Sequence, residues 1–118
     1  MADTNKQFDQ VTAKCRRIFI DKMQDYGPSW RIFRLHGITD QLYIKACNIR
    51  QRQESGVSLV GDDIEGNLRA IVNYGVTAII QSRNGYADAI DMTNERATQL
   101  YDEVLQEAKD LMLRKNHD

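Results

Sequence analysis

The amino-acid sequence predicts one all-α domain spanning residues 1–118, arranged like a four-helix bundle and completed by association with further copies. The chain has 118 residues, near the usual size for one hydrophobic core. In four long segments apolar residues recur every three or four positions, the spacing of a helix with one buried face. No segment alternates apolar and polar residues over a useful length, so strands are not expected.

The first helix is expected over about residues 5–25. Thr4 and Gln7 have the spacing of a capping box, in which the two side chains satisfy free backbone donors. Gly27-Pro28 is a typical helix stop, because proline cannot continue the hydrogen-bond ladder. The aromatic-rich connector 28–37 is expected to hold a short helical turn and to close at its final glycine.

Three more helices follow, over about 39–55, 62–83 and 93–115. Two apolar residues of the third helix, Val76 and Ile80, lie outside its main apolar stripe. A helix that is apolar on more than one side is central or faces another subunit. We therefore expect the third helix to be central or to face another subunit.

The two cysteines, Cys15 and Cys47, fall among apolar positions of expected helices and form no CxxC pair. Both are expected to be reduced core residues. Every apolar run is interrupted within a few residues, so no membrane span is expected. The first ten residues lack the basic start and apolar stretch of a signal peptide, and a cytoplasmic location is expected.

Charge is balanced overall and uneven along the chain. The net charge is −1, which makes nucleic acid an unlikely partner. Residues 1–52 carry ten Lys/Arg and five Asp/Glu, and residues 53–118 carry six and twelve. A basic half could bind phosphates and an acidic half a cation. Alternatively, the halves attract each other within the chain or between subunits.

Several common kinds of chemistry find no support in the sequence. There is no GxSxG elbow for a nucleophilic serine and no GxxxxGK phosphate loop. The two histidines, His36 and His117, lie in a connector and in the tail, so neither a zinc site nor a Cys–His pair is indicated.

An acidic group spans the end of the second helix and the start of the third. It comprises Glu54, Asp62, Asp63 and Glu65. Carboxylates on two adjacent antiparallel helices could hold Mg²⁺, which prefers oxygen ligands and usually recruits substrate phosphates as well. The alternative is that these residues cap the third helix and carry solvated charge.

A basic and aromatic group follows the end of the first helix and continues on the second. Its members are Lys22, Tyr26, Trp30, Arg31, Arg34, Lys45 and Arg50. Phosphates require cationic donors, and a base requires a flat apolar face. The alternative is that Trp30 and Phe33 cover the end of the core while the arginines surround it.

Two segments carry a resemblance to a known family. The first is Lys22-Met23-Gln24-Asp25-Tyr26-Gly27-Pro28-Ser29-Trp30-Arg31. The second is Asp62-Asp63-Ile64-Glu65-Gly66-Asn67-Leu68, continuing to Ile71-Val72-Asn73-Tyr74. Both resemble the nucleotide-modification-associated domain of the first type, a bacterial and phage family. Such domains are similar to MazG-like all-α nucleoside triphosphate pyrophosphohydrolases, which hold Mg²⁺ with carboxylates on neighbouring helices and assemble as dimers or tetramers.

The resemblance implies roles for individual residues. The implied metal ligands are Glu54, Asp62 and Glu65. The implied nucleotide-facing residues are Lys22, Asp25, Tyr26, Trp30, Lys45, Arg50 and Asn73, and Arg34 joins them from the basic group. This chain departs from the hydrolase pattern at Gly66 and Ala70, where active relatives tend to carry further acids.

The sequence therefore predicts a homo-oligomeric helical protein that binds a (deoxy)nucleotide. In the enzymatic version, Mg²⁺ on the phosphates supports release of pyrophosphate. In the alternative version, the protein is a non-catalytic helical adaptor or nucleotide sensor, which the missing acids favour.

Overall fold

The computed structural model describes residues 3–56 and 63–117. These residues form four α-helices and one 3₁₀ turn, and no strand occurs among them. The elements are α1 (Thr4–Tyr26), η1 (Ser29–Ile32), α2 (Leu35–Ser55), α3 (Asp63–Asn84) and α4 (Asn94–His117). The predicted all-α class is confirmed.

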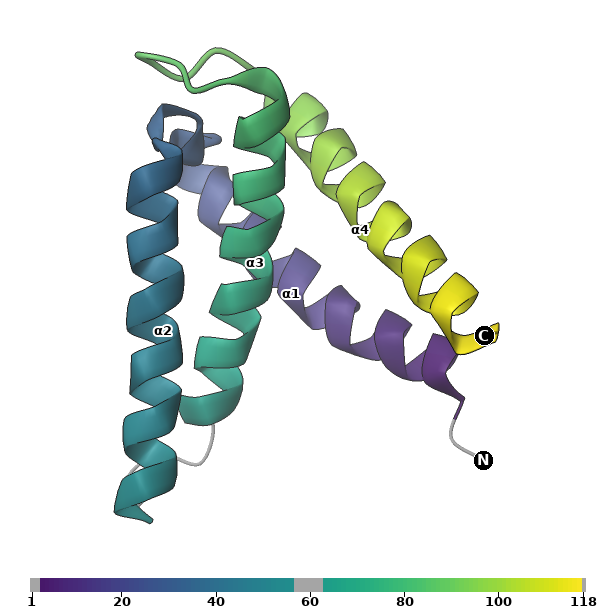
Figure 1. Ribbon diagram of the computed structural model, residues 1–118. Helices are drawn as coiled ribbons and strands as arrows, with labels where there is room; N and C mark the ends of the chain where they lie inside the picture. Colours follow the sequence, from purple (N-terminus) through teal and green to yellow (C-terminus); the bar gives the residue numbers. More distant parts are fainter. Residues whose placement is uncertain (1–2, 57–62, 118) are drawn as a thin grey trace.

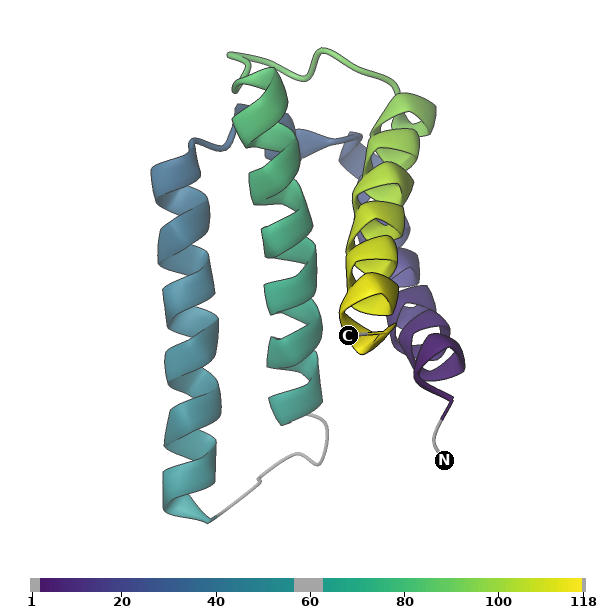
Figure 2. The ribbon, with the colours of Figure 1, turned by 45° about the vertical axis from the view of Figure 1, so that its right-hand side comes forward.

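The helices form two pairs, α2 with α3 and α1 with α4, and α3 contacts both helices of the second pair. Helices α2 and α3 lie side by side and antiparallel over most of their length, whereas α1 and α4 form a second pair inclined to the first (Figures 1 and 2). Helix α3 contacts α1 and α4 as well as α2. The third helix is therefore central, the first of the two positions predicted for it, and α2 lies at the edge with α3 as its main neighbour.

The ends of α1 show how local sequence sets its length. The Asp3 side chain accepts a hydrogen bond from the Lys6 N–H at 3.1 Å, so Asp3 is the N-cap and the prediction of a Thr4 cap was wrong by one residue. At the other end Gly27 adopts φ 71°, a conformation that favours glycine. Its N–H donates to the Met23 carbonyl at 2.8 Å and closes the helix as predicted.

Helix α2 begins at Leu35, four residues before the predicted start at Thr39. The Thr39 hydroxyl donates to the Leu35 carbonyl at 2.9 Å, so this side chain bonds back into the helix and does not cap it. Gly37 therefore lies in the first turn of α2 and does not close the connector. The predicted short helical turn is present as η1.

The core lies between α1, η1, α3 and α4. The Phe19 ring stacks on Tyr101 at a centroid distance of 4.3 Å, and the Trp30 ring lies 5.7 Å from Phe19. Val76 and Ile80 are buried beside them, on the side of α3 that lay outside the predicted stripe. Helix α2 contributes little, because Ile38 is its one buried residue.

Exposure corrects the prediction that both cysteines are buried. Cys15 is buried as expected, but Cys47 is exposed. Cys47 lies nine residues after Ile38, and at 3.6 residues per turn these two side chains leave α2 on opposite sides. The apolar residues Val11 on α1 and Leu68 on α3 are also largely exposed. Apolar spacing predicts which face of a helix is apolar, but it does not show whether the described residues cover that face.

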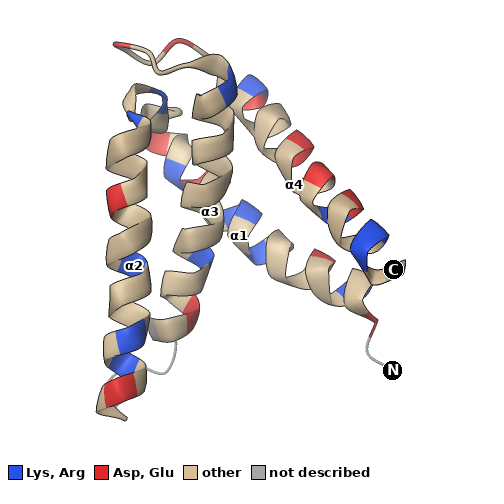
Figure 3. Cartoon of the chain, in the orientation of Figure 1, with Lys and Arg blue, Asp and Glu red and all other residues tan. Residues whose placement is uncertain are grey.

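Ion pairs join the basic N-terminal half to the acidic C-terminal half. Arg16 on α1 donates to Asp102 on α4 at 2.8 Å, and Arg31 of η1 donates to Asp91 at 2.9 Å. Acidic and basic residues occur together on all four helices (Figure 3). Within the described residues no helix is long and apolar enough to cross a membrane.

Candidate functional site

A cavity of about 220 Å³ lies between α1, η1 and the middle of α3. Four aromatic side chains line it together with polar and small residues. The aromatic ones are Phe19, Trp30, Phe33 and Tyr74, and the polar ones are Lys22, Ser29, Arg69, Asn73 and Thr77. An apolar cavity with a few polar groups converging on it is the usual form of a small-molecule site.

The charge on the cavity wall is positive. Lys22 comes from α1 and Arg69 from α3, and no Asp or Glu lines the cavity among the described residues. Lys22 is exposed and has no ion-pair partner in the described part of the chain. Arg69 donates to Glu65, one helical turn earlier, at 2.9 Å. The cavity therefore suits an anionic ligand.

The aromatic side chains differ in what they can offer a ligand. Trp30 is only 7% exposed and packs against Phe19, so most of its ring surface is already used by the core. Its indole N–H is buried without a hydrogen-bond partner among the described residues. Phe33 is 38% exposed and Tyr74 is half-buried, which leaves more of these two rings available for stacking.

The carboxamide of Asn73 is held from two sides. Its Nδ2 donates to the Cys15 carbonyl on α1 at 3.0 Å, and its Oδ1 accepts from the Tyr101 hydroxyl on α4 at 2.7 Å. Burial raises the pKa of Tyr101, so this hydroxyl keeps its proton and remains a donor. Asn73 thus joins three helices and fixes the inner wall of the cavity.

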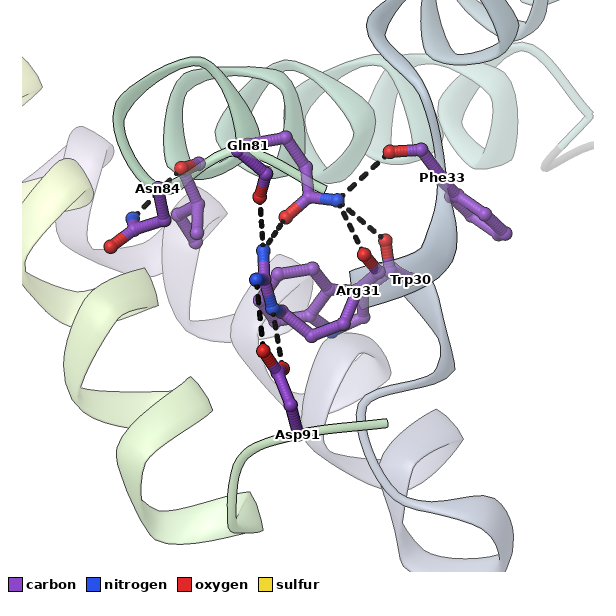
Figure 4. A network of polar contacts seen from close by, with 8 residues as sticks. Trp30, Arg31, Phe33, Gln81, Asn84 and Asp91 are labelled. Atoms are coloured by element: carbon purple, nitrogen blue, oxygen red, sulfur yellow. Dashed lines mark hydrogen bonds and ion pairs between the residues drawn. The ribbon is translucent and has the colours of Figure 1, made fainter. Parts of the chain in front are cut away.

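A buried arginine holds η1 in place (Figure 4). Arg31 donates to the Asp91 carboxylate, to the Gly85 carbonyl at 2.7 Å and to Oε1 of Gln81. The hydrogen bond from Arg31 lowers the pKa of Asp91. Gln81 Nε2 in turn donates to the carbonyls of η1 and its flank, at 3.2 Å to Trp30, 2.9 Å to Arg31 and 2.8 Å to Phe33. This network positions Trp30 of η1 and Phe33, which directly follows η1, against α3.

The cavity brings together three of the eight residues predicted to face a nucleotide. Lys22, Trp30 and Asn73 come from three different elements and all line it. Trp30 occupies the position described by the alternative interpretation, at the end of the core, while it also forms part of the cavity wall.

The other five predicted nucleotide residues lie elsewhere. Asp25 and Tyr26 are exposed at the end of α1, with Tyr26 79% exposed. The Arg34 guanidinium stacks over the Tyr86 ring at 4.2 Å. Lys45 and Arg50 are on α2 and do not line the cavity.

The predicted metal ligands are engaged in local ion pairs where they are described. Glu54 lies 3.3 Å from Arg50 at the far end of α2 from η1, and Glu65 pairs with Arg69. Asp62 lies outside the described residues. Among the described residues no group of three or more His, Cys, Asp or Glu side chains could hold a metal ion.

Sequence reasoning missed Arg69 as a site residue. Arg69 precedes Asn73 by four positions and Thr77 follows by four, so all three share one face of α3. Extending the predicted Asn73 along its helix face would have found both neighbours. It would not have shown that α1 supplies the opposite wall.

Comparison with known proteins gives one match. The family described as nucleotide modification associated domain 1 matches residues 22–82, which are 61 of the 118 residues. No curated protein and no solved structure matches the chain. The matched segment runs from Lys22 through α3 and includes every residue named here as lining the cavity except Phe19. The chain belongs to the nucleotide modification associated domain 1 family.

Proposed function

We propose that this protein binds a nucleotide in the cavity between α1 and α3. The observation that carries the proposal is the convergence of Lys22, Arg69 and the aromatic wall on one cavity of about 220 Å³. Cationic side chains attract the phosphate, and aromatic faces stack with the base. Membership of a family associated with nucleotide modification supports the same ligand class.

Enzymatic activity is a separate part of the proposal. In the hydrolase version, Glu54, Asp62 and Glu65 would hold Mg²⁺, which would help a water molecule to attack the α-phosphate so that pyrophosphate leaves. In the sensor version, the protein binds the nucleotide and transmits that state to other molecules. The ion pairs of Glu54 and Glu65 favour the sensor version, because a metal would have to displace Arg50 and Arg69 from them.

We also propose that two copies of the chain associate through α2. The outer face of α2 exposes Tyr43 (71%) and Ile44 (45%), flanked by Asp40 on one side and Arg50 on the other. In a two-fold interface, if one residue of the first copy contacts a second residue of the other copy, the same contact occurs again with the copies exchanged. Two antiparallel α2 helices centred near Lys45 would therefore place Asp40 opposite Arg50 twice and cover the apolar centre.

Thermal unfolding with a panel of nucleotides, with and without Mg²⁺, tests the binding proposal. A ligand at 100 times its Kd stabilises the folded state by about 2.7 kcal/mol, which is easily measured as a rise in Tm. Lys22→Gln should reduce the rise. Lys6→Gln, an equal charge change at the far end of α1, should not. Unchanged Tm with every nucleotide would contradict nucleotide binding.

Two further measurements test the hydrolase version and the association of two copies. Pyrophosphate release from nucleoside triphosphates with Mg²⁺ would establish the hydrolase version, and binding without turnover would establish the sensor version. Sedimentation equilibrium should show dimers that Ile44→Asp dissociates and Gln53→Asp does not. Monomers at all concentrations would rule out assembly through α2.

A further inference from the structure

The cavity between α1 and α3 has a charge and size that select among nucleotides. Its two cations, Lys22 and Arg69, face no carboxylate on the cavity wall within the described residues. A phosphate monoester carries about −1.5 to −2 charges at pH 7, which two cations balance without a metal ion. A triphosphate carries more negative charge than this wall can neutralise alone.

The volume of the cavity also favours a nucleotide with a single phosphate. Ligand sites for drug-sized molecules measure about 300–1,000 Å³. At about 220 Å³, this cavity lies below that range, so it suits a nucleotide with one phosphate better than a nucleoside triphosphate. A single phosphate at the cationic mouth leaves the apolar interior for the base.

Arg69 already has an anionic partner. Its guanidinium donates to Glu65 at 2.9 Å, and the Arg69 side chain is 24% exposed whereas Glu65 is 66% exposed. Glu65 lines the neighbouring hollow between α1 and α3, which shares Arg69 with the cavity. A phosphate entering the cavity would therefore compete with the Glu65 carboxylate for the same guanidinium.

From these observations we infer that the cavity binds a nucleoside monophosphate without a metal ion, and that Glu65 competes with its phosphate for Arg69. This inference rests on the proposed nucleotide binding and specifies its ligand. It assigns Glu65 a role opposite to that of a metal ligand: removing its charge strengthens binding of the nucleotide.

Isothermal titration with nucleoside monophosphates in EDTA tests the inference. Arg69→Gln should weaken binding about tenfold or more, because a hydrogen bond to a charged group is lost. Glu65→Gln should tighten binding about two- to fivefold, the range expected when an exposed ion pair no longer competes. Circular dichroism melts of both variants confirm that they fold.

Glu107→Gln is the matched control. It also removes one carboxylate from an ion pair with an arginine, Arg83, and neither residue lines the cavity. Its affinity for the monophosphate in EDTA should equal that of the unmodified protein. If Glu107→Gln and Glu65→Gln tighten binding equally, the effect is one of net charge, and competition for Arg69 is refuted.

The outcomes separate this inference from the proposed function. Binding of a nucleoside triphosphate with Mg²⁺ but of no monophosphate in EDTA would overturn the inference and leave nucleotide binding intact. Binding of neither would overturn both. Weaker binding by Glu65→Gln in EDTA would also refute the competition, since it would make Glu65 a ligand contact.

Discussion

The carboxamide oxygen of Asn73 accepts a hydrogen bond from the Tyr101 hydroxyl at 2.7 Å. This contact joins α3 to α4 directly behind the cavity, while the amide nitrogen of the same side chain reaches the Cys15 carbonyl of α1. One polar side chain of α3 thus links α3 to both α1 and α4. The shape of the cavity depends on it.

Tyr101→Phe should lower the free energy of unfolding by about 1–3 kcal/mol, because Asn73 Oδ1 would lose its donor in a partly buried position. Urea denaturation measures this loss. Tyr26→Phe is the control, since Tyr26 is 79% exposed and its change should be near zero. Equal effects of the two substitutions would refute a structural role for the contact.

Trp30 is expected to stabilise the core through its ring and not through its N–H. Trp30→Ala should cost about 3–5 kcal/mol, as is typical when a large buried aromatic residue is truncated. Trp30→Phe should cost less than half of that, because the indole Nε1 has no hydrogen-bond partner among the described residues. Similar losses for both variants in chemical denaturation would contradict this prediction.

Asp91 should contribute to the acid sensitivity of the fold. The hydrogen bond from Arg31 lowers the pKa of Asp91 in the folded protein below its value of about 3.9 in the unfolded chain. Its contribution is therefore present above about pH 4 and is lost as the pH falls through the folded-state pKa. Asp91→Asn should show a smaller loss of stability between pH 5 and pH 2.

Asp88→Asn is the control for this acid titration. Asp88 lies in the same connector, but it is 96% exposed and 4.0 Å from the nearest guanidinium nitrogen of Arg34. Its variant should keep the acid profile of the unmodified protein. If Asp91→Asn loses as much stability between pH 5 and pH 2 as the unmodified protein, the ion pair of Asp91 with Arg31 does not contribute to the pH dependence of folding.

The two thiols should differ in reactivity. Cys47 is exposed and should react quickly with a thiol reagent in dilute protein. Cys15 is buried, and burial raises the pKa of its thiol, so it should react only after unfolding. Because the proposed dimer covers α2, the rate at Cys47 should fall with protein concentration, and Ile44→Asp should remove that dependence. Two equally fast thiols would contradict the packing of α1.

The helices could be predicted from sequence because their signals are local. Apolar spacing, the Gly27-Pro28 stop and the polar helix starts need only a few neighbouring residues. The early start of α2 was missed because Thr39, which looks like a cap, instead donates to the Leu35 carbonyl inside the helix.

The site could be predicted only in part because it depends on which helices meet. Lys22 and Asn73 were found from residue chemistry and family resemblance, and both line the cavity. Arg50 was assigned to the same site, yet it lies on the edge helix and pairs with Glu54. Sequence spacing shows neither that α2 contacts chiefly α3 nor that α1 contributes to the cavity wall.

A fluorine label on Trp30 tests nucleotide occupancy of the cavity most directly. Trp30 is the only tryptophan in the sequence and lines the cavity, so 5-fluorotryptophan gives a single ¹⁹F resonance from the site. Titration with a nucleoside monophosphate should shift this resonance to saturation, and Arg69→Gln should move the midpoint to higher concentration. A resonance that stays fixed while calorimetry shows nucleotide binding would place the ligand elsewhere and contradict the site.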